Sequence, residues 1–180
     1  MIYVTGNKKK FEEAKIVLEG ISLEQKDLDL VEIQGTGSEI IYEKAQSAWK
    51  ILQQPFVIED VCFEAEALGG MPGPYIKDFL FALADKNLTF YDVVAPLSSK
   101  RGQAICRVAF VEAKDKIRIF TGEASGDIVE PKGELDHGKV SFNKIFKPDG
   151  SEKTYGQMSM AEHALCSARS DALRKLILVL

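Results

Sequence analysis

The stretch that decides the fold of this chain is FVIEDVCFEAEALGGMPGPYIKDFL, residues 56–80. Its first residues, Phe56 to Ile58, form a short apolar run that predicts a buried strand. We expect this strand to end at two adjacent carboxylates, Glu59 and Asp60. A buried strand that delivers negative charge to its own end indicates a functional site, although adjacent acids at a strand end are more often solvated turn residues.

The second half of the same stretch is a loop followed by a helix. Three glycines and two prolines within residues 69–74 fix unusual backbone angles, so the loop is shaped and not slack. Apolar residues then recur at helical spacing from Tyr75, and this predicted helix carries Lys77 back towards the acids. Together these features indicate a metal and phosphate site; the alternative is a loop that merely reverses the chain.

Composition limits the class of protein. With 180 residues, 46% of them hydrophobic, the chain can bury one substantial core, so we expect a single domain over residues 1–180. A net charge of -4 argues against nucleic acid as a partner. No apolar run is long enough for a signal peptide or a membrane span, which predicts a soluble, cytoplasmic protein. The three cysteines are widely spaced, which favours reduced thiols in the core.

The N-terminus predicts an anion site. Residues 2–4 read as a strand, Thr5-Gly6-Asn7 as a turn, and residues 8–18 as a helix. Three lysines, residues 8–10, therefore fall in the first helical turn, where the helix dipole is already positive. A bound phosphate would remove this conflict. The alternative is a solvated lysine face, which costs only a few tenths of a kcal/mol per residue.

The remaining segments interleave strands and helices. Leu28 to Val31 predicts a strand, and Ser38 an N-cap for a helix with Lys44 at the edge of its apolar stripe, where its ammonium reaches a cleft or simply solvent. Residues 104–112 and 117–123 predict a hairpin of two strands. A last helix is expected from Met160 to the chain end, with its buried positions at Leu165, Ala168, Ala172, Leu176 and Leu180. This order predicts an α/β protein with a mixed sheet.

Motifs along the whole chain resemble those of the inosine/xanthosine triphosphate pyrophosphatase family, which hydrolyses non-standard purine nucleoside triphosphates to monophosphate and pyrophosphate. Their order and spacing are specific, although none decides alone. The matching segments are Thr5-Gly6-Asn7 with Lys10, Glu32-x-Gln34-Gly35, Glu59-Asp60, residues 67–77 (ALGGMPGPYIK), residues 125–133 (SGDIVEPKG) and Pro148-Asp149-Gly150.

The resemblance implies roles for individual residues. Thr5, Asn7 and Lys10 match the family's triphosphate-contacting motif, which agrees with the anion argument above. Lys44 and Lys77 match its further substrate-binding lysines. Water would then attack the α-phosphorus in line, with the lysines, Lys10 among them, and a metal neutralising charge.

The acids have roles of their own in this resemblance. Glu32 and Asp60 match the family's magnesium-associated carboxylates, and Asp60 is also the position assigned as general base. Glu59 stands beside it as a supporting acid. Because Mg²⁺ prefers a few carboxylates completed by water and phosphate oxygens, so small a set is what such a site needs.

The segment implied to bind the base departs from the family. Where the family has Phe-Gly-Trp-Asp-Pro, this chain has Val140-Ser141-Phe142-Asn143-Lys144, and His163 replaces a substrate lysine. The family's Ser-His-Arg triplet is Ser167-Ala168-Arg169 here. These changes exchange donors and acceptors, each worth about 1 to 3 kcal/mol in base discrimination. The implied base-binding residues are thus Phe142, Asn143, His163 and Arg169.

The resemblance also implies the overall architecture: an α/β fold of two lobes around a long mixed sheet with flanking helices, and a homodimer. The leading function is a Mg²⁺-dependent nucleoside triphosphate pyrophosphatase with an altered base preference. Two alternatives stay open, namely the family's usual inosine or xanthosine triphosphate activity, and a nucleotide-binding or sensing protein with little turnover. Retention of Glu32, Glu59 and Asp60 argues against the pure binder.

Overall fold

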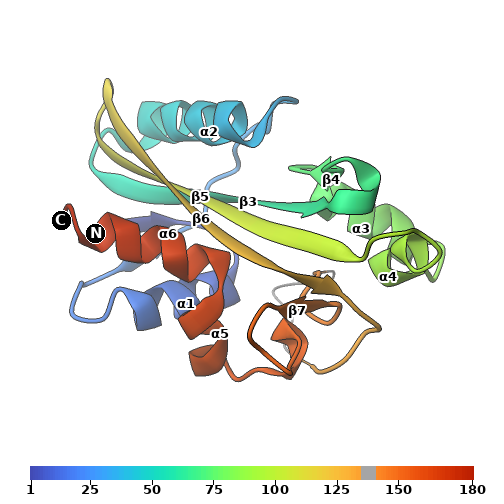
Figure 1. Ribbon diagram of the computed structural model, residues 1–180. Coiled ribbons are helices and arrows are strands. Elements are labelled where there is room, and N and C mark those ends of the chain that lie inside the picture. Colours follow the sequence, from blue (N-terminus) through green and yellow to red (C-terminus); the bar gives the residue numbers. More distant parts are fainter. Residues whose placement is uncertain (135–140) are drawn as a thin grey trace.

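One mixed sheet runs through the molecule in a computed structural model that describes residues 1–134 and 141–180 (Figure 1). Within these residues the sheet has seven strands in the order β2-β1-β3-β5-β6-β7, with β4 paired to β3. β1 runs parallel to β2 and β3, and the other pairs are antiparallel. The strands are β1 (Ile2–Val4), β2 (Glu24–Lys26), β3 (Phe56–Ala65), β4 (Pro72–Gly73), β5 (Arg101–Ala113), β6 (Lys116–Ile128) and β7 (Phe146–Pro148).

Helices cover both faces of this sheet. α2 lies on one face, and α1, α5 and α6 lie on the other, whereas α3 and α4 gather at the far end near β4 (Figure 1). The two ends form two lobes joined by the long β3, β5 and β6 strands, which confirms the expected α/β architecture. The helices are α1 (Lys8–Val17), α2 (Gly37–Leu52), α3 (Ile76–Ala84), α4 (Phe90–Val94), α5 (Met160–Cys166) and α6 (Ala168–Ile177).

The core has two parts, one on each side of the sheet. Side chains of a strand alternate between faces, so β3 contributes to both. Val57 and Phe63 belong to the larger part, in which Phe63 packs edge-on against Phe90 of α4. Ile58 belongs with Ile41 and Ala45 of α2 to the smaller part. All of these side chains are at most 2% exposed. Burial of each large apolar side chain stabilises the fold by roughly 1.5–3 kcal/mol.

The strand predicted to end at Glu59 and Asp60 does not end there. β3 continues through both acids to Ala65 and pairs with β5 along its whole length. Two adjacent acids can lie in the middle of a buried strand because each carboxylate forms an ion pair on its own face of the sheet. Glu59 pairs with Arg169, and Asp60 pairs with Lys44.

The strand predicted over Leu28 to Val31 is wrong, because the chain is extended and paired at residues 24–26 instead. β1 is only three residues long and leaves the sheet after the Thr5 N–H bonds to the Lys26 carbonyl, so among the described residues no strand pairs with the chain beyond Lys26. Val31 is accordingly 85% exposed. The N-cap of α2 is Thr36, which forms a capping box with Glu39, and not Ser38.

The last helix is interrupted. Ser167 has extended backbone angles and caps α6, so the segment forms α5 and α6 and not one continuous helix. The predicted buried positions Ala168, Ala172 and Leu176 are correct, whereas Leu165 is 73% and Leu180 is 55% exposed. The break changes the helical phase, which is why Leu165 falls on the outer side.

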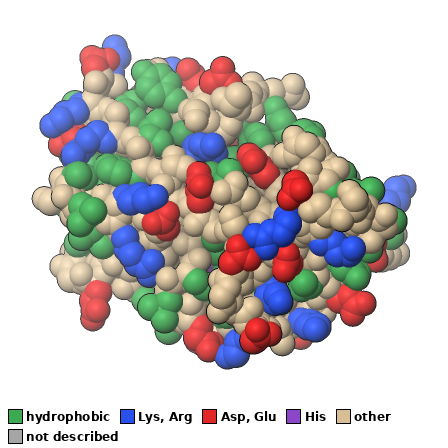
Figure 2. Space-filling view, viewed as in Figure 1, with side chains coloured by type: hydrophobic (Ala, Val, Ile, Leu, Met, Phe, Trp, Pro, Cys, Tyr) green, Lys and Arg blue, Asp and Glu red, His purple; other side chains and the backbone are tan. Residues whose placement is uncertain are grey.

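Two surface features complete the fold. Positive and negative side chains are interspersed on the face drawn in Figure 2. Among the helices of the described residues, none combines the length and the apolar character needed to span a membrane. The three cysteines are free thiols, and Cys62 and Cys106 are buried, as expected.

Candidate active site

A pocket of about 540 Å³ lies beside β3, at a point where the sheet is open. β1 pairs with β3 as far as Ile58, and β4 pairs with it from Phe63. Residues 59–62 of β3 therefore have no strand partner on this side within the described chain. Because the edge is open, side chains from both faces of β3 reach the same pocket. It lies at the carboxyl end of the parallel strand β1, the usual position of ligand sites in open α/β sheets.

The turn after β1 forms one wall of the pocket. Asn7 is the N-cap of α1, and its Oδ1 accepts hydrogen bonds from the backbone N–H groups of Lys9 (3.0 Å) and Lys10 (3.3 Å). Thr5 Oγ1 accepts one from the Asn7 N–H at 3.1 Å. Thr5, Asn7 and Lys10 thus line the pocket around the start of a helix, where anions are favoured.

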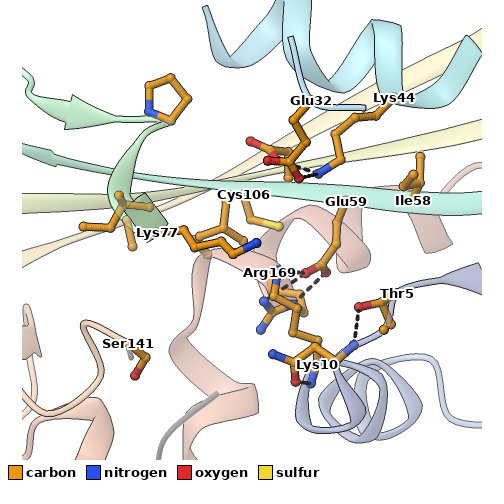
Figure 3. A pocket seen from close by; sticks show the side chains of 18 of the residues that line it. Thr5, Lys10, Glu32, Lys44, Ile58, Glu59, Lys77, Cys106, Ser141 and Arg169 are labelled. Carbon is orange, nitrogen blue, oxygen red and sulfur yellow. Dashed lines mark hydrogen bonds and ion pairs between the residues drawn. The ribbon is translucent and has the colours of Figure 1, made fainter. Parts of the chain in front are cut away.

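Glu59 forms a buried ion-pair network on the α6 face of β3. Arg169 donates Nε to Oε2 at 2.7 Å and Nη2 to Oε1 at 3.0 Å, and the hydroxyl of Tyr3 also donates to Oε2. Lys10 Nζ lies 3.1 Å from Oε1 (Figure 3). Burial alone would raise the pKa of Glu59, but the charges of Arg169 and Lys10 lower it to about 2. An ionised Glu59 therefore holds Arg169 and Lys10 in place.

Glu13, an acid that the sequence analysis missed, holds the other side of Arg169. It is fully buried on α1 and accepts hydrogen bonds from Arg169 Nη1 and from the hydroxyls of Ser167 and Ser170. His163 Nδ1 lies 3.3 Å from its Oε2. Burial would raise the pKa of Glu13, yet Arg169 and His163 hold it well below its usual range. In the sequence, Arg169 could have pointed to Glu13, because a cation that is buried needs acids buried beside it.

Glu32, Lys44 and Asp60 meet on the opposite face, below α2. The ammonium of Lys44 lies 2.8 Å from Glu32 Oε1 and 3.0 Å from Asp60 Oδ1 (Figure 3). Burial alone would lower the pKa of Lys44, but the Asp60 charge and the bond to Glu32 raise it. Burial would likewise raise the pKa of Glu32, and Lys44 lowers it.

The carboxylates of Glu32 and Asp60 fit a magnesium site in which other groups supply the remaining ligands. No group of three or more His, Cys, Asp or Glu side chains within residues 1–134 and 141–180 is arranged to hold a metal. One cation, the Lys44 ammonium, nevertheless already contacts oxygens of both Glu32 and Asp60. Two carboxylates completed by water and phosphate oxygens are a usual environment for Mg²⁺.

Lys77 enters the pocket from the other lobe. It lies in the first turn of α3, and its side chain extends towards the space between the Glu32 and Glu59 carboxylates (Figure 3). No acid among the described residues lies within ion-pair distance of it, although its charge contributes to lowering the pKa of Glu32. Its loop is tied to the Glu32 loop, since the Gly35 N–H donates to the Tyr75 hydroxyl at 3.1 Å.

The implied base-binding residues line the end of the pocket nearest α5. Phe142 packs on Phe63 with ring centroids 4.6 Å apart, and His163 packs edge-on against Tyr155 at 4.4 Å. Asn143 and His163 are each only 2% exposed. Val140 lies outside the described residues.

All twelve residues predicted for the site line this one pocket, although they come from three loops, five helices and one strand. They are Thr5, Asn7, Lys10, Glu32, Lys44, Glu59, Asp60, Lys77, Phe142, Asn143, His163 and Arg169. The pocket therefore combines four cationic side chains and the start of a helix with the Glu32 and Asp60 carboxylates and an aromatic end. Such a pocket suits a nucleotide with its phosphates near β1.

Comparison with known proteins identifies the family. The sequence profile of the Ham1 family matches residues 1–179. Inosine triphosphate pyrophosphatase of Schizosaccharomyces pombe is 35% identical over 178 residues, which cover 98% of this chain and 92% of that protein. The enzyme of the same name from Yarrowia lipolytica is 37% identical over 179 residues, covering 98% and 93%. The chain belongs to the Ham1 family.

Solved structures share this fold. The Ham1 protein of Staphylococcus aureus superposes with a TM-score of 0.76 at 21% identity, covering 97% of this chain and 95% of that one. A HAM1 protein from Coxiella burnetii also gives 0.76, at 22% identity and 99% and 96% coverage. At such identities the likeness concerns the fold alone, and the resemblance found in the motifs is confirmed by the family profile.

Proposed function

We propose that this protein hydrolyses nucleoside triphosphates to nucleoside monophosphate and pyrophosphate with Mg²⁺. Its preferred base is one other than hypoxanthine or xanthine. The observation that carries the proposal is the convergence of Lys10, Lys44 and Lys77 with Glu32 and Asp60 in one pocket. Relatives with 35–37% identity that carry the name inosine triphosphate pyrophosphatase support the reaction class.

The pocket's own residues suggest a division of labour. Thr5, Asn7 and Lys10 at the start of α1 would bind the triphosphate, with Lys77 closing on it from α3. Asp60 would take the proton of the attacking water. Glu32 and Asp60 would hold Mg²⁺, which supplies charge neutralisation at the phosphates when bound. Glu59 would act indirectly, because Arg169, Tyr3 and Lys10 occupy its two oxygens.

The altered base preference rests on the α5 end of the pocket. Asn143 both donates and accepts where the family's aspartate only accepts, and His163 replaces a flexible lysine. Each group is nearly buried, so a base that leaves one of them unpaired is rejected by roughly 1–3 kcal/mol.

Three further properties belong to the same proposal. We expect residues 1–180 to form a single domain, because one sheet passes through both lobes. The proposal also includes a homodimer, which family membership supports, and a cytoplasmic location, which the composition of the chain supports. Size-exclusion chromatography with light scattering tests the dimer directly.

The decisive experiment is a pyrophosphate-release assay with Mg²⁺ over standard and deaminated ribo- and deoxyribonucleoside triphosphates. Preference for a base other than hypoxanthine or xanthine supports the full proposal. Preference for inosine or xanthosine triphosphate retains the reaction and removes the altered specificity. Silence over the whole panel, combined with measurable nucleotide binding, would favour a sensing protein instead.

A further inference from the structure

The position of Lys44 between two acids has a consequence beyond substrate binding. Its ammonium contacts Glu32 Oε1 at 2.8 Å and Asp60 Oδ1 at 3.0 Å. The side chains of Lys44 and Asp60 are only 14% and 12% exposed. Partly buried carboxylates need a nearby cation, and in this arrangement a lysine supplies it.

Two cations that share this pair of carboxylates repel each other. A divalent ion held by Glu32 and Asp60 would contact the same two carboxylates that bind the ammonium. At so short a separation, like charges near a protein surface disfavour each other. The lysine stem is flexible, whereas the backbone of α2 that carries it is packed on the sheet through Ile41, Ala45 and Ala48. The ammonium can therefore move while its helix stays in place.

We propose that Lys44 is a placeholder cation: it neutralises Glu32 and Asp60 while no metal is bound, and it leaves them for a substrate phosphate when the metal arrives. This inference rests on the proposed function for the identity of both ligands. Lys44 thus couples metal loading to phosphate binding, because the same event that fills the carboxylates releases a cation into the pocket. Because one cation replaces the other, Glu32 and Asp60 always have a neutralising charge beside them.

Lys77 provides the matched control. It lines the same pocket and extends towards the space between Glu32 and Glu59, but no carboxylate of the described residues lies within ion-pair distance of it. Its charge acts on Glu32 only over a longer distance. A substrate lysine without an ion pair should affect nucleotide binding and change the binding of the metal alone less than Lys44 does.

The test is isothermal titration of the full chain with MgCl₂ in the absence of nucleotide. Lys44→Gln is expected to bind Mg²⁺ about three- to tenfold more tightly than the wild type, and Lys77→Gln within about twofold of it. Both variants should raise the KM for the preferred triphosphate. Lys44→Met, with the stem intact, is a second variant should the glutamine disturb folding, which circular dichroism would report.

A direct readout follows the ammonium itself. In the wild type, saturating Mg²⁺ should shift the side-chain ¹⁵N resonance of Lys44 and leave that of exposed Lys8 unchanged. Equal or weaker Mg²⁺ binding by Lys44→Gln and Lys44→Met, or a Lys44 resonance that does not move at saturation, would overturn the inference. So would a wild type that binds no Mg²⁺. These titrations contain no nucleotide, so absence of pyrophosphate release counts against the proposed function alone.

Discussion

Glu59 and Asp60 are adjacent in the chain, but their carboxylates lie on opposite faces of β3. Glu59 pairs with Arg169 of α6, and Asp60 pairs with Lys44 of α2. Alternation along a strand makes this separation unavoidable. It assigns the two acids to different environments: Glu59 is 5% exposed and its oxygens are engaged by three side chains, whereas Asp60 borders the pocket next to a single lysine.

The first prediction concerns Asp60. Asp60→Asn removes the proposed base without changing the size of the side chain, so kcat should fall by about 10²–10⁴-fold. Nucleotide affinity should change little, because the lysines and the α1 N-terminus remain. Pyrophosphate release and equilibrium binding of the same triphosphate measure the two effects. Undiminished turnover would show that another group takes the proton.

The second prediction separates two adjacent glutamates of α1. Glu13→Gln removes a charge that faces Arg169 and His163 in the core, and should lower the free energy of unfolding by about 3 kcal/mol. Glu12→Gln is the matched control, because the Glu12 side chain is 55% exposed and pairs with Lys15, which is itself 45% exposed. Its effect should stay within about 0.5 kcal/mol. Urea unfolding compares them, and equal effects would contradict the role given to the Glu13 network.

The third prediction is a loss of stability in acid. The pKa of Glu59 falls from 4.5 to about 2 on folding, so its ionised form stabilises the folded state above about pH 4.5. That contribution, about 3 kcal/mol, disappears as the pH falls through 2. Urea unfolding at a series of pH values should show this slope, and Glu13→Gln should show a shallower one. A stability that is constant between about pH 5 and pH 3 would refute it.

The fourth prediction concerns the tie between the two loops at the pocket mouth. Tyr75→Phe removes the hydroxyl that accepts the Gly35 N–H, so the Glu32 loop and the Lys77 loop lose their hydrogen bond. The KM for nucleotide should rise about three- to tenfold, and the Gly35 amide should exchange faster. Tyr42→Phe is the control, because the Tyr42 hydroxyl accepts a hydrogen bond from Gln46 of its own helix and does not join the two loops. If the Gly35 amide exchanged faster and the KM did not change, the hydrogen bond between the loops would have no role in nucleotide binding.

Local pattern predicted much of the fold, including α1, the β5 and β6 hairpin and the apolar face of α2. It failed where distant contacts decide. The stretch over Leu28 to Val31 reads as a strand, but β1 ends too early to pair with it. The phase of the last helix is lost at Ser167, where the cap is stabilised by Glu13 from the other end of the chain.

The motifs selected residues that the fold brings into one pocket, because they recorded residue types in order. They could not indicate that Glu59 and Asp60 face apart, or that Lys44 bridges Glu32 and Asp60. They also gave no reason to select Glu13, whose importance depends on Arg169, 156 residues away in sequence. Such pairings are properties of the folded sheet and its two faces.

The open edge of β3 makes this site modular. The residues that depart from the family, Asn143, His163 and Ala168, belong to the segments that pack on the α6 side, whereas Glu32, Lys44 and Asp60 lie on the α2 side. A single strand separates the two groups, and Lys44 joins Glu32 and Asp60 on the α2 side. Residues of the proposed base end can therefore diverge in evolution, or be redesigned, without disturbance of this α2-side cluster. A change at His163, in contrast, reaches Lys10 through the ion pairs of Glu13, Arg169 and Glu59.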